Sequence, residues 1–170
     1  MNVSSAQLST PEFVVELLAA LDHSGLSPDR LLLEITETSV LRDVERVIPR
    51  LAALRTLGVR VAVDDFGTGY SSLAYLSRLP LDVLKIDKSF VDRVLSDAQG
   101  ASVAQAVLDM SNSLGLTTVG EGVESSDQAR WLLEAGCTLG QGYLWSRPVD
   151  REDIDALLAD LPARVLRLPD

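Results

Sequence analysis

Short apolar segments alternate with helical segments along nearly the whole chain, and this alternation is the feature that most limits the possible folds. The segments expected as strands are mainly apolar runs, which is typical of strands covered by helices on both faces. Repeated strand–helix units predict an α/β fold with parallel strands joined by right-handed crossovers. Ser9 is the expected N-cap of the first helix, and Pro11 suits its first turn. The expected strands are 2–4, 30–36, 59–65, 81–87, 117–123 and 138–144, and the expected helices are 9–22, 40–57, 71–79, 101–114, 126–136 and 150–160.

The number of expected strands bears on the architecture. An open doubly wound sheet suits six strands, whereas a (β/α)₈ barrel needs eight, so the count alone favours the open sheet. The chain begins, however, with at most four residues of its first strand, which is expected of a chain that starts inside a larger domain. Composition and periodicity leave both architectures open. Because 170 residues without a linker suit one core, we expect 1–170 to form a single domain that is incomplete at its N-terminus.

Composition excludes several functional classes. The 25 acidic and 15 basic residues give a net charge of −10, and no polybasic run is present, which disfavours DNA, RNA and anionic membranes as partners. The one histidine, His23, excludes zinc sites built on two histidines. The one cysteine, Cys137, lies in an apolar stretch and is expected to be buried and inert. No apolar run is long enough to cross a bilayer and no signal peptide follows Met1, so we expect a soluble, cytoplasmic protein.

Polar residues gather where the expected strands end, which in a parallel sheet is one face and the usual ligand site. Carboxylates and an amide are hard oxygen donors suited to Mg²⁺ or Mn²⁺, and two such ions about 3.5–4 Å apart can promote in-line attack on phosphorus. Lys85 could orient the attacking water, or could form a structural salt bridge with a neighbouring carboxylate. In chain order these residues are Asn2, Glu34, Glu37, Asp64, Asp65, Lys85, Asp87, Glu121, Glu124 and Gln141.

A glycine-rich segment, 66–72, directly follows the acidic pair Asp64–Asp65. Its two glycines permit a positive φ and close approach of the backbone, which suits a lid or a phosphate-binding loop, although an ordinary strand–helix connection fits equally well. The segment 65–67 also matches the metal-binding tripeptide of protein kinases, but the other kinase motifs are missing from the chain.

Taken in order, these residues resemble the EAL domain, the bacterial phosphodiesterase that linearises cyclic di-GMP. The resemblance implies a modified (β/α)₈ barrel, here about six strand–helix units long, and it overrules the open sheet. It extends over nearly the whole chain, in the blocks 2–8, 33–37, 63–73, 84–87, 121–124 and 141–148.

The resemblance also implies roles for individual residues. Asn2, Glu34 and Asp64 would bind one metal ion. Asp64 would bridge to a second ion, which Asp65 and Glu121 would also bind. The expected catalytic residues are therefore Asp65, Glu121 and a lysine.

That lysine is Lys85, which resembles the lysine near the attacking water. Gln141 resembles the active-site glutamine, and Glu124 matches a position beside the substrate. Glu37 resembles the glutamate that anchors the loop after the acidic pair and couples dimer contacts to activity. Asp87 is grouped with these three as an expected substrate-binding or loop residue.

One departure from the family is plain: the tripeptide Glu-Ala-Leu occurs nowhere in the chain. In the family it lies upstream of the position of Asn2, and its glutamate binds the first metal ion. About two strand–helix units, on the order of 60–80 residues, would precede the chain in a complete barrel. We therefore expect a weakened first metal site, and an open sheet edge that favours a homodimer or a swapped element.

Three functions follow from these observations. The first is metal-dependent hydrolysis of cyclic di-GMP, in a domain that could follow sensory or GGDEF domains in a longer parent protein. The second is a catalytically impaired remnant that binds cyclic di-GMP or a partner, which the missing glutamate would suggest. The third is an enolase-like barrel with Lys85 as the base, which the acidic pair and the glycine loop fit poorly.

Overall fold

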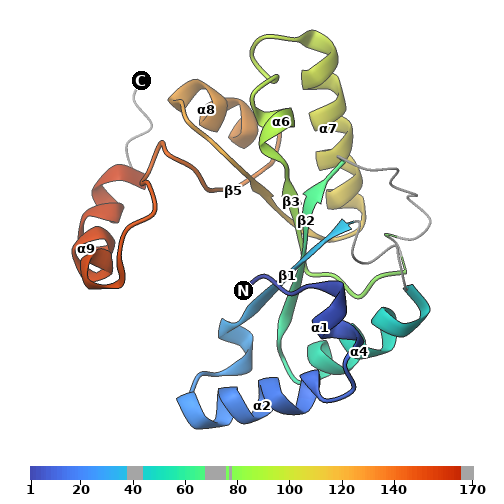
Figure 1. Cartoon of the computed structure of the whole chain (residues 1–170). Helices are drawn as coiled ribbons and strands as arrows, with labels where there is room; N and C mark the ends of the chain where they lie inside the picture. The colour runs from blue at the N-terminus through green and yellow to red at the C-terminus, as the bar shows by residue number, and fades with distance from the viewer. Residues whose placement is uncertain (38–43, 68–75, 77, 166–170) are drawn as a thin grey trace. The chain divides into compact units, whose positions relative to one another are not determined.

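The computed structural model describes residues 1–37, 44–67, 76 and 78–165 (Figure 1). Five strands form a sheet in which the spatial order β1-β2-β3-β4-β5 follows the order along the chain. The strands are β1 (Leu32–Thr36), β2 (Arg60–Phe66), β3 (Val83–Ile86), β4 (Thr117–Gly120) and β5 (Leu139–Gly140). The α-helices are α1 (Ser5–Ser9), α2 (Phe13–Ser24), α4 (Val44–Thr56), α6 (Lys88–Val91), α7 (Ala98–Ser113), α8 (Ser126–Glu134) and α9 (Ile154–Val165), and the 3₁₀ turns are η1 (Pro28–Arg30) and η2 (Arg151–Asp153).

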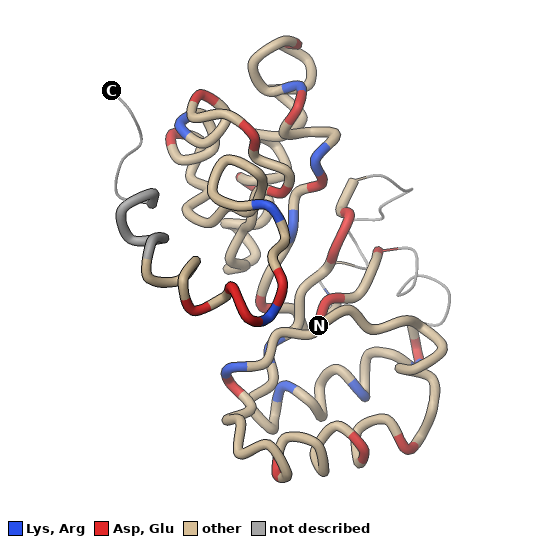
Figure 2. Tube along the Cα trace, turned by 60° about the vertical axis from the view of Figure 1, so that its left-hand side comes forward, with Lys and Arg blue, Asp and Glu red and all other residues tan. Residues whose placement is uncertain are grey.

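The chain divides into two compact units. We call Met1–Lys85 with Ser111–Thr117 the N-terminal unit, and Ile86–Met110 with Thr118–Asp170 the C-terminal unit. Among the helices that the structure describes, none is long and apolar enough to cross a membrane. Along the described residues, Lys and Arg form no long continuous stretch, and Asp and Glu occur in both units (Figure 2).

In the N-terminal unit, β1 and β2 are parallel, with Leu33 opposite Val61 and Thr36 opposite Asp64. The first residues of the chain run beside β1 through a parallel bridge between Asn2 and Glu34. This segment is an isolated bridge and not a full strand, but it lies where the first strand was predicted. Burial alternates along β1, so Leu33 and Ile35 are buried while Glu34 faces the other side of the sheet.

The predicted helix over 9–22 is wrong in its bounds. A capping box between Ser4 and Gln7 starts α1 at Ser5, and α1 ends at Ser9, the residue predicted as an N-cap. Thr10 follows with an extended backbone (φ −74°, ψ 128°), because the residue before a proline is pushed out of the helical region. The helix resumes as α2, and α1 packs against both α2 and α4 in this unit (Figure 1).

In the C-terminal unit, β4 and β5 are parallel. The predicted strand over 138–144 is too long, because β5 contains only Leu139 and Gly140. After β5 the chain turns at Gly142 and returns to Val123, whose carbonyl accepts a hydrogen bond from the Leu144 N–H at 3.0 Å. A capping box between Ser125 and Gln128 starts α8 where the sequence predicts it. Cys137 is buried and free, as expected.

Candidate metal centre and substrate pocket

An ion-paired trio occupies neighbouring strands of the N-terminal unit. The Lys85 ammonium donates to Glu34 Oε2 at 2.8 Å and to Asp64 Oδ1 at 3.0 Å. The lysine side chain is 5% exposed, and those of Glu34 and Asp64 are 20% and 16% exposed. Burying an ammonium is costly unless carboxylates compensate it, and two do so here. Lys85 therefore forms the salt bridge that was one of its two predicted roles, in a position between two predicted metal ligands.

Asp65 has a left-handed backbone, with φ at 55°. Successive residues of a strand point to opposite faces, so two adjacent carboxylates reach one site only where the strand geometry is broken. The left-handed residue provides this break, and a ligand oxygen of Asp65 comes within 4.8 Å of one of Asp64. The Asp65 N–H also donates to Asp64 Oδ1 at 3.2 Å. A non-glycine residue with positive φ is a strained feature of the kind that gathers at functional sites.

Three carboxylates therefore lie near one ammonium in the N-terminal unit, those of Glu34, Asp64 and Asp65. The surplus of negative charge and the hard oxygen donors fit divalent cations such as Mg²⁺ or Mn²⁺. Asn2 joins this group through its backbone bridge to Glu34, and the residue as a whole is exposed.

Glu37 connects the end of β1 to the segment after the acidic pair. Its side chain is buried, and Oε2 accepts a hydrogen bond from the Gly67 N–H at 3.1 Å. Gly67 itself has φ at 96°, which favours glycine at this position. The predicted loop over 66–72 continues from here, but 68–72 lie outside the described residues.

In the C-terminal unit, Glu121 and Gln141 face each other after the ends of β4 and β5. Gln141 Nε2 donates to Glu121 Oε1 at 2.6 Å, which orients the carboxylate. The Glu121 N–H donates to Ile86 O at 3.0 Å, so the backbone of this residue is also held. The two residues were predicted separately, and the structure brings them together.

Glu124 forms an ion pair with a residue that the sequence did not single out, Lys88. The Lys88 ammonium lies 2.7 Å from Glu124 Oε1 and 3.1 Å from Asp92 Oδ1. These hydrogen bonds, that to Glu124 first, raise the pKa of Lys88 above its ordinary value. The one sequence feature that could have pointed to Lys88 is its position directly after the block 84–87. Asp87, the last residue of that block, caps α6 by accepting from the Ser89 N–H at 2.9 Å.

A cavity of about 460 Å³, with charged and amide side chains among its lining residues, opens beside these residues in the C-terminal unit. Its wall includes a cation–π pair, in which the Arg147 guanidinium lies 4.6 Å from the centre of the Tyr143 ring. Charged, amide and aromatic groups together suit a nucleotide ligand. The lining residues include Lys88, Glu124, Gln141, Tyr143 and Arg147.

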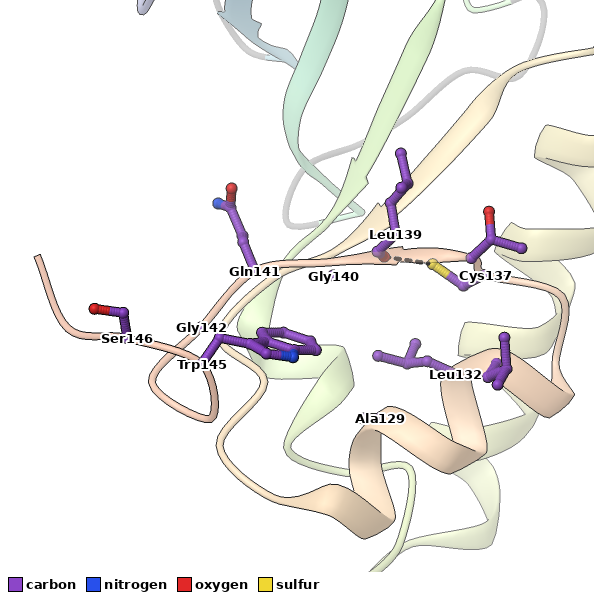
Figure 3. Close-up of a pocket in the computed structure, with 11 residues that line it drawn as sticks. Ala129, Leu132, Cys137, Leu139, Gly140, Gln141, Gly142, Trp145 and Ser146 are labelled. Carbon is purple, nitrogen blue, oxygen red and sulfur yellow. Dashed lines mark hydrogen bonds between the residues drawn. The ribbon is translucent and has the colours of Figure 1, made fainter. Parts of the chain in front are cut away.

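A second cavity in this unit, of about 490 Å³, is apolar (Figure 3). Below β5, the ring of Trp145 and the side chain of Leu132 point toward each other, and the Cys137 thiol donates to Leu139 O at 3.3 Å (Figure 3). None of the described residues that line this cavity is charged. These described lining residues therefore offer no carboxylate or imidazole.

Comparison with known proteins decides the family. The family model described as the EAL domain matches residues 1–148. The chain belongs to the EAL domain family. Membership agrees with the α/β architecture and with the barrel type that the residues resemble.

Individual EAL proteins are similar over almost the whole chain. The crystal structure of the EAL domain of Mycobacterium smegmatis DcpA is 42% identical with a TM-score of 0.88, covering 94% of this chain and 72% of that one. The manganese and cyclic di-GMP complex of Klebsiella pneumoniae BlrP1 at pH 9.0 is 37% identical with a TM-score of 0.82, covering 87% of this chain and 38% of that one. The cyclic di-GMP phosphodiesterase NbdA of Pseudomonas aeruginosa is 43% identical over 158 residues, which are 93% of this chain and 20% of that protein. This EAL chain thus spans about a fifth of the length of the first curated relatives that it matches.

Proposed function

We propose that this EAL domain hydrolyses one phosphodiester bond of cyclic di-GMP, giving the linear dinucleotide, with the help of divalent metal ions. The observation that supports this most is the ion-paired trio of Lys85, Glu34 and Asp64, with the strained Asp65 beside it. Relatives named for this activity or solved with this ligand add to it.

For the metal ions we propose Mg²⁺ or Mn²⁺ at two sites. Asn2, Glu34 and Asp64 would bind one ion, and Asp64, Asp65 and Glu121 the other. The hard oxygen donors and the surplus of carboxylates in the N-terminal unit support this assignment. When bound, the ions would supply Lewis-acid stabilisation of the negative charge on the phosphate.

The remaining roles belong to the protein's own side chains. Lys85 would orient the attacking water and offset charge on a non-bridging phosphate oxygen. Gln141 would hold the Glu121 carboxylate in place, consistent with their 2.6 Å hydrogen bond. The nucleotide would enter the cavity beside Glu124, where the Tyr143 side chain would contact a base.

A second function has one specific feature in its favour. The chain lacks the tripeptide Glu-Ala-Leu, whose glutamate would bind the first ion in the family. A domain with a weakened first site could bind cyclic di-GMP without turning it over. The two functions differ in turnover and not in binding, so both must be measured.

The test is chromatography of the nucleotides after incubation of the chain with cyclic di-GMP and Mn²⁺ or Mg²⁺. We expect linear dinucleotide from the unaltered chain and a loss of at least about a hundredfold in Asp65→Asn, a typical loss when a catalytic group is removed. Asp127→Asn is the matched control, because Asp127 forms an exposed ion pair on α8. Turnover should be unchanged in this control.

A longer version, extended upstream of residue 1 with a Glu-Ala-Leu segment of the family, separates the outcomes. If the chain is inactive and the longer version is active, the weakened first site is the cause. If both bind cyclic di-GMP by calorimetry without hydrolysing it, the binding function is correct and the catalytic proposal is wrong.

We further propose that the domain is cytoplasmic and forms a homodimer. A reducing compartment suits a chain with one unpaired, buried cysteine. The curated relatives are about five times longer, which supports the proposal that sensory or GGDEF domains accompany it. Light scattering over a concentration series tests the dimer, and a monomer throughout would contradict it.

A further inference from the structure

The segment Glu121–Glu124, which joins β4 to α8 in the C-terminal unit, begins with a proposed metal ligand. The segment is short and its backbone is unusual, because Gly122 has φ at 65°. Whatever holds Gly122 therefore also limits where the Glu121 carboxylate can lie.

Lys88 packs directly on Gly122. A Cβ atom built on Gly122 would lie 2.5–2.7 Å from the Cβ, Cγ and Cδ atoms of Lys88, so the lysine stem fills the space where a side chain would be. At its end, the ammonium lies 3.4 Å from Gly122 O and 2.7 Å from Glu124 Oε1. Lys88 thus contacts the segment through its stem and through its charge.

Other residues hold the rest of the segment. The Glu124 N–H donates to Gln128 Oε1 at 2.8 Å, and the Val123 N–H donates to Gln141 O at 3.0 Å. The Gln128 side chain also donates to Val91 O at 3.4 Å, at the end of the helix that Lys88 begins. The segment is therefore packed between α6 on one side and the residues after β5 on the other.

We propose that Lys88 is a positioning residue, which holds Gly122 and Glu124 so that the Glu121 carboxylate is already oriented toward Gln141 when a metal ion binds. The inference rests on the proposed function, because it assumes that Glu121 binds an ion. Residues that orient metal ligands in this way typically change metal affinity by 10–100-fold when they are removed.

The test is Mn²⁺ binding by calorimetry with the unaltered chain and three variants. Lys88→Met keeps most of the stem and removes the charge, and we expect it to weaken Mn²⁺ binding about tenfold. Lys88→Arg keeps the charge, and we expect affinity within about threefold of the unaltered chain. Arg130→Met is the matched control, since Arg130 is a similarly exposed cation paired with Asp127 at 2.9 Å. It should leave Mn²⁺ affinity unchanged.

Asp65→Asn separates the failure of this inference from the failure of the proposed function. If Asp65→Asn loses the Mn²⁺ ion assigned to Asp64, Asp65 and Glu121, and Lys88→Met binds that ion as well as the unaltered chain does, the positioning role is refuted and the metal site stands. If the unaltered chain and Asp65→Asn are alike in binding none, the metal site and the positioning role both fail. Circular dichroism shows whether each variant is folded. If Lys88→Met does not fold, Lys88→Gln, which also keeps much of the stem and lacks the charge, takes its place with the same expected loss of Mn²⁺ affinity.

Discussion

Replacing Lys85 by methionine tests the energetic reasoning behind the ion-paired trio. The change keeps a long apolar stem in a site that is 5% exposed and removes the ammonium that Glu34 and Asp64 share. Two unit charges about 5 Å apart, a common separation for oxygens around one ammonium, repel by about 3 kcal/mol at an effective dielectric constant of about 20.

Breaking a buried ion pair by removing one partner usually costs about 3–5 kcal/mol. Because Glu34 and Asp64 are 20% and 16% exposed, solvent relieves part of the repulsion, and we expect about 3 kcal/mol. For a chain of this size the melting temperature should fall by about 6–12 °C in EDTA. Saturating Mn²⁺ should narrow the difference, since a divalent ion would neutralise the same two carboxylates.

The assay is thermal unfolding followed by circular dichroism, with Arg78→Met as the control. Arg78 pairs with Glu45 at 3.3 Å, but the two side chains are 54% and 82% exposed. Such a pair contributes less than about 1 kcal/mol, so this control should melt within about 3 °C of the unaltered chain. Equal melting of Lys85→Met and Arg78→Met in EDTA would refute the argument that burial makes the trio energetically important.

Three further changes test other parts of the structure by thermal unfolding. Gly142→Ala should destabilise the chain by at least about 3 kcal/mol, because a Cβ there would lie 2.2 Å from a backbone oxygen. Gly115→Ala has free space around it and should cost about 1–2 kcal/mol. Similar losses of stability in the two variants would contradict the packing argument. Asp82→Ala removes the carboxylate that accepts a hydrogen bond from the Val61 N–H at 2.9 Å, and it should destabilise the fold by about 2 kcal/mol. A loss under about 0.5 kcal/mol would show that water replaces the carboxylate as the acceptor. The raised pKa of Lys88 means that its ion pairs stabilise the fold below pH 10.5 and lose this effect as the pH rises through the higher folded pKa. The melting difference between the unaltered chain and Lys88→Met should therefore stay constant from pH 7 to about 9.5 and shrink above 10.5, and a constant difference to pH 12 would contradict this.

Local sequence patterns predicted most of the sheet. The apolar runs 30–36, 59–65 and 81–87 became β1, β2 and β3 within a few residues at each end. Such runs are reliable signals because a short apolar segment between turn-forming residues has few other ways to bury itself. Two of the errors, at 9–22 and 138–144, arose where a neighbouring proline or glycine changed the backbone direction within an otherwise continuous pattern.

The candidate site was predicted as a set of residue types more than as an arrangement. That carboxylates follow the strands, and that they suit hard metal ions, could be seen in the residues around Glu34, Asp64 and Asp65. A salt bridge of Lys85 to a neighbouring carboxylate was one of two predicted roles, but its two partners, Glu34 and Asp64, could not be predicted, because they depend on the register between separate strands.

What the sequence determined by itself is therefore chemical and local: the strands, the residues at their ends and the family to which they belong. Tertiary structure decided the rest, namely the left-handed turn at Asp65, the pairing of Glu121 with Gln141 and the packing of Lys88 on Gly122. The residues in these contacts lie far apart in the sequence, by 34 positions for Lys88 and Gly122. No short-range pattern encodes such a contact, because it forms only when the elements that hold its two ends have packed.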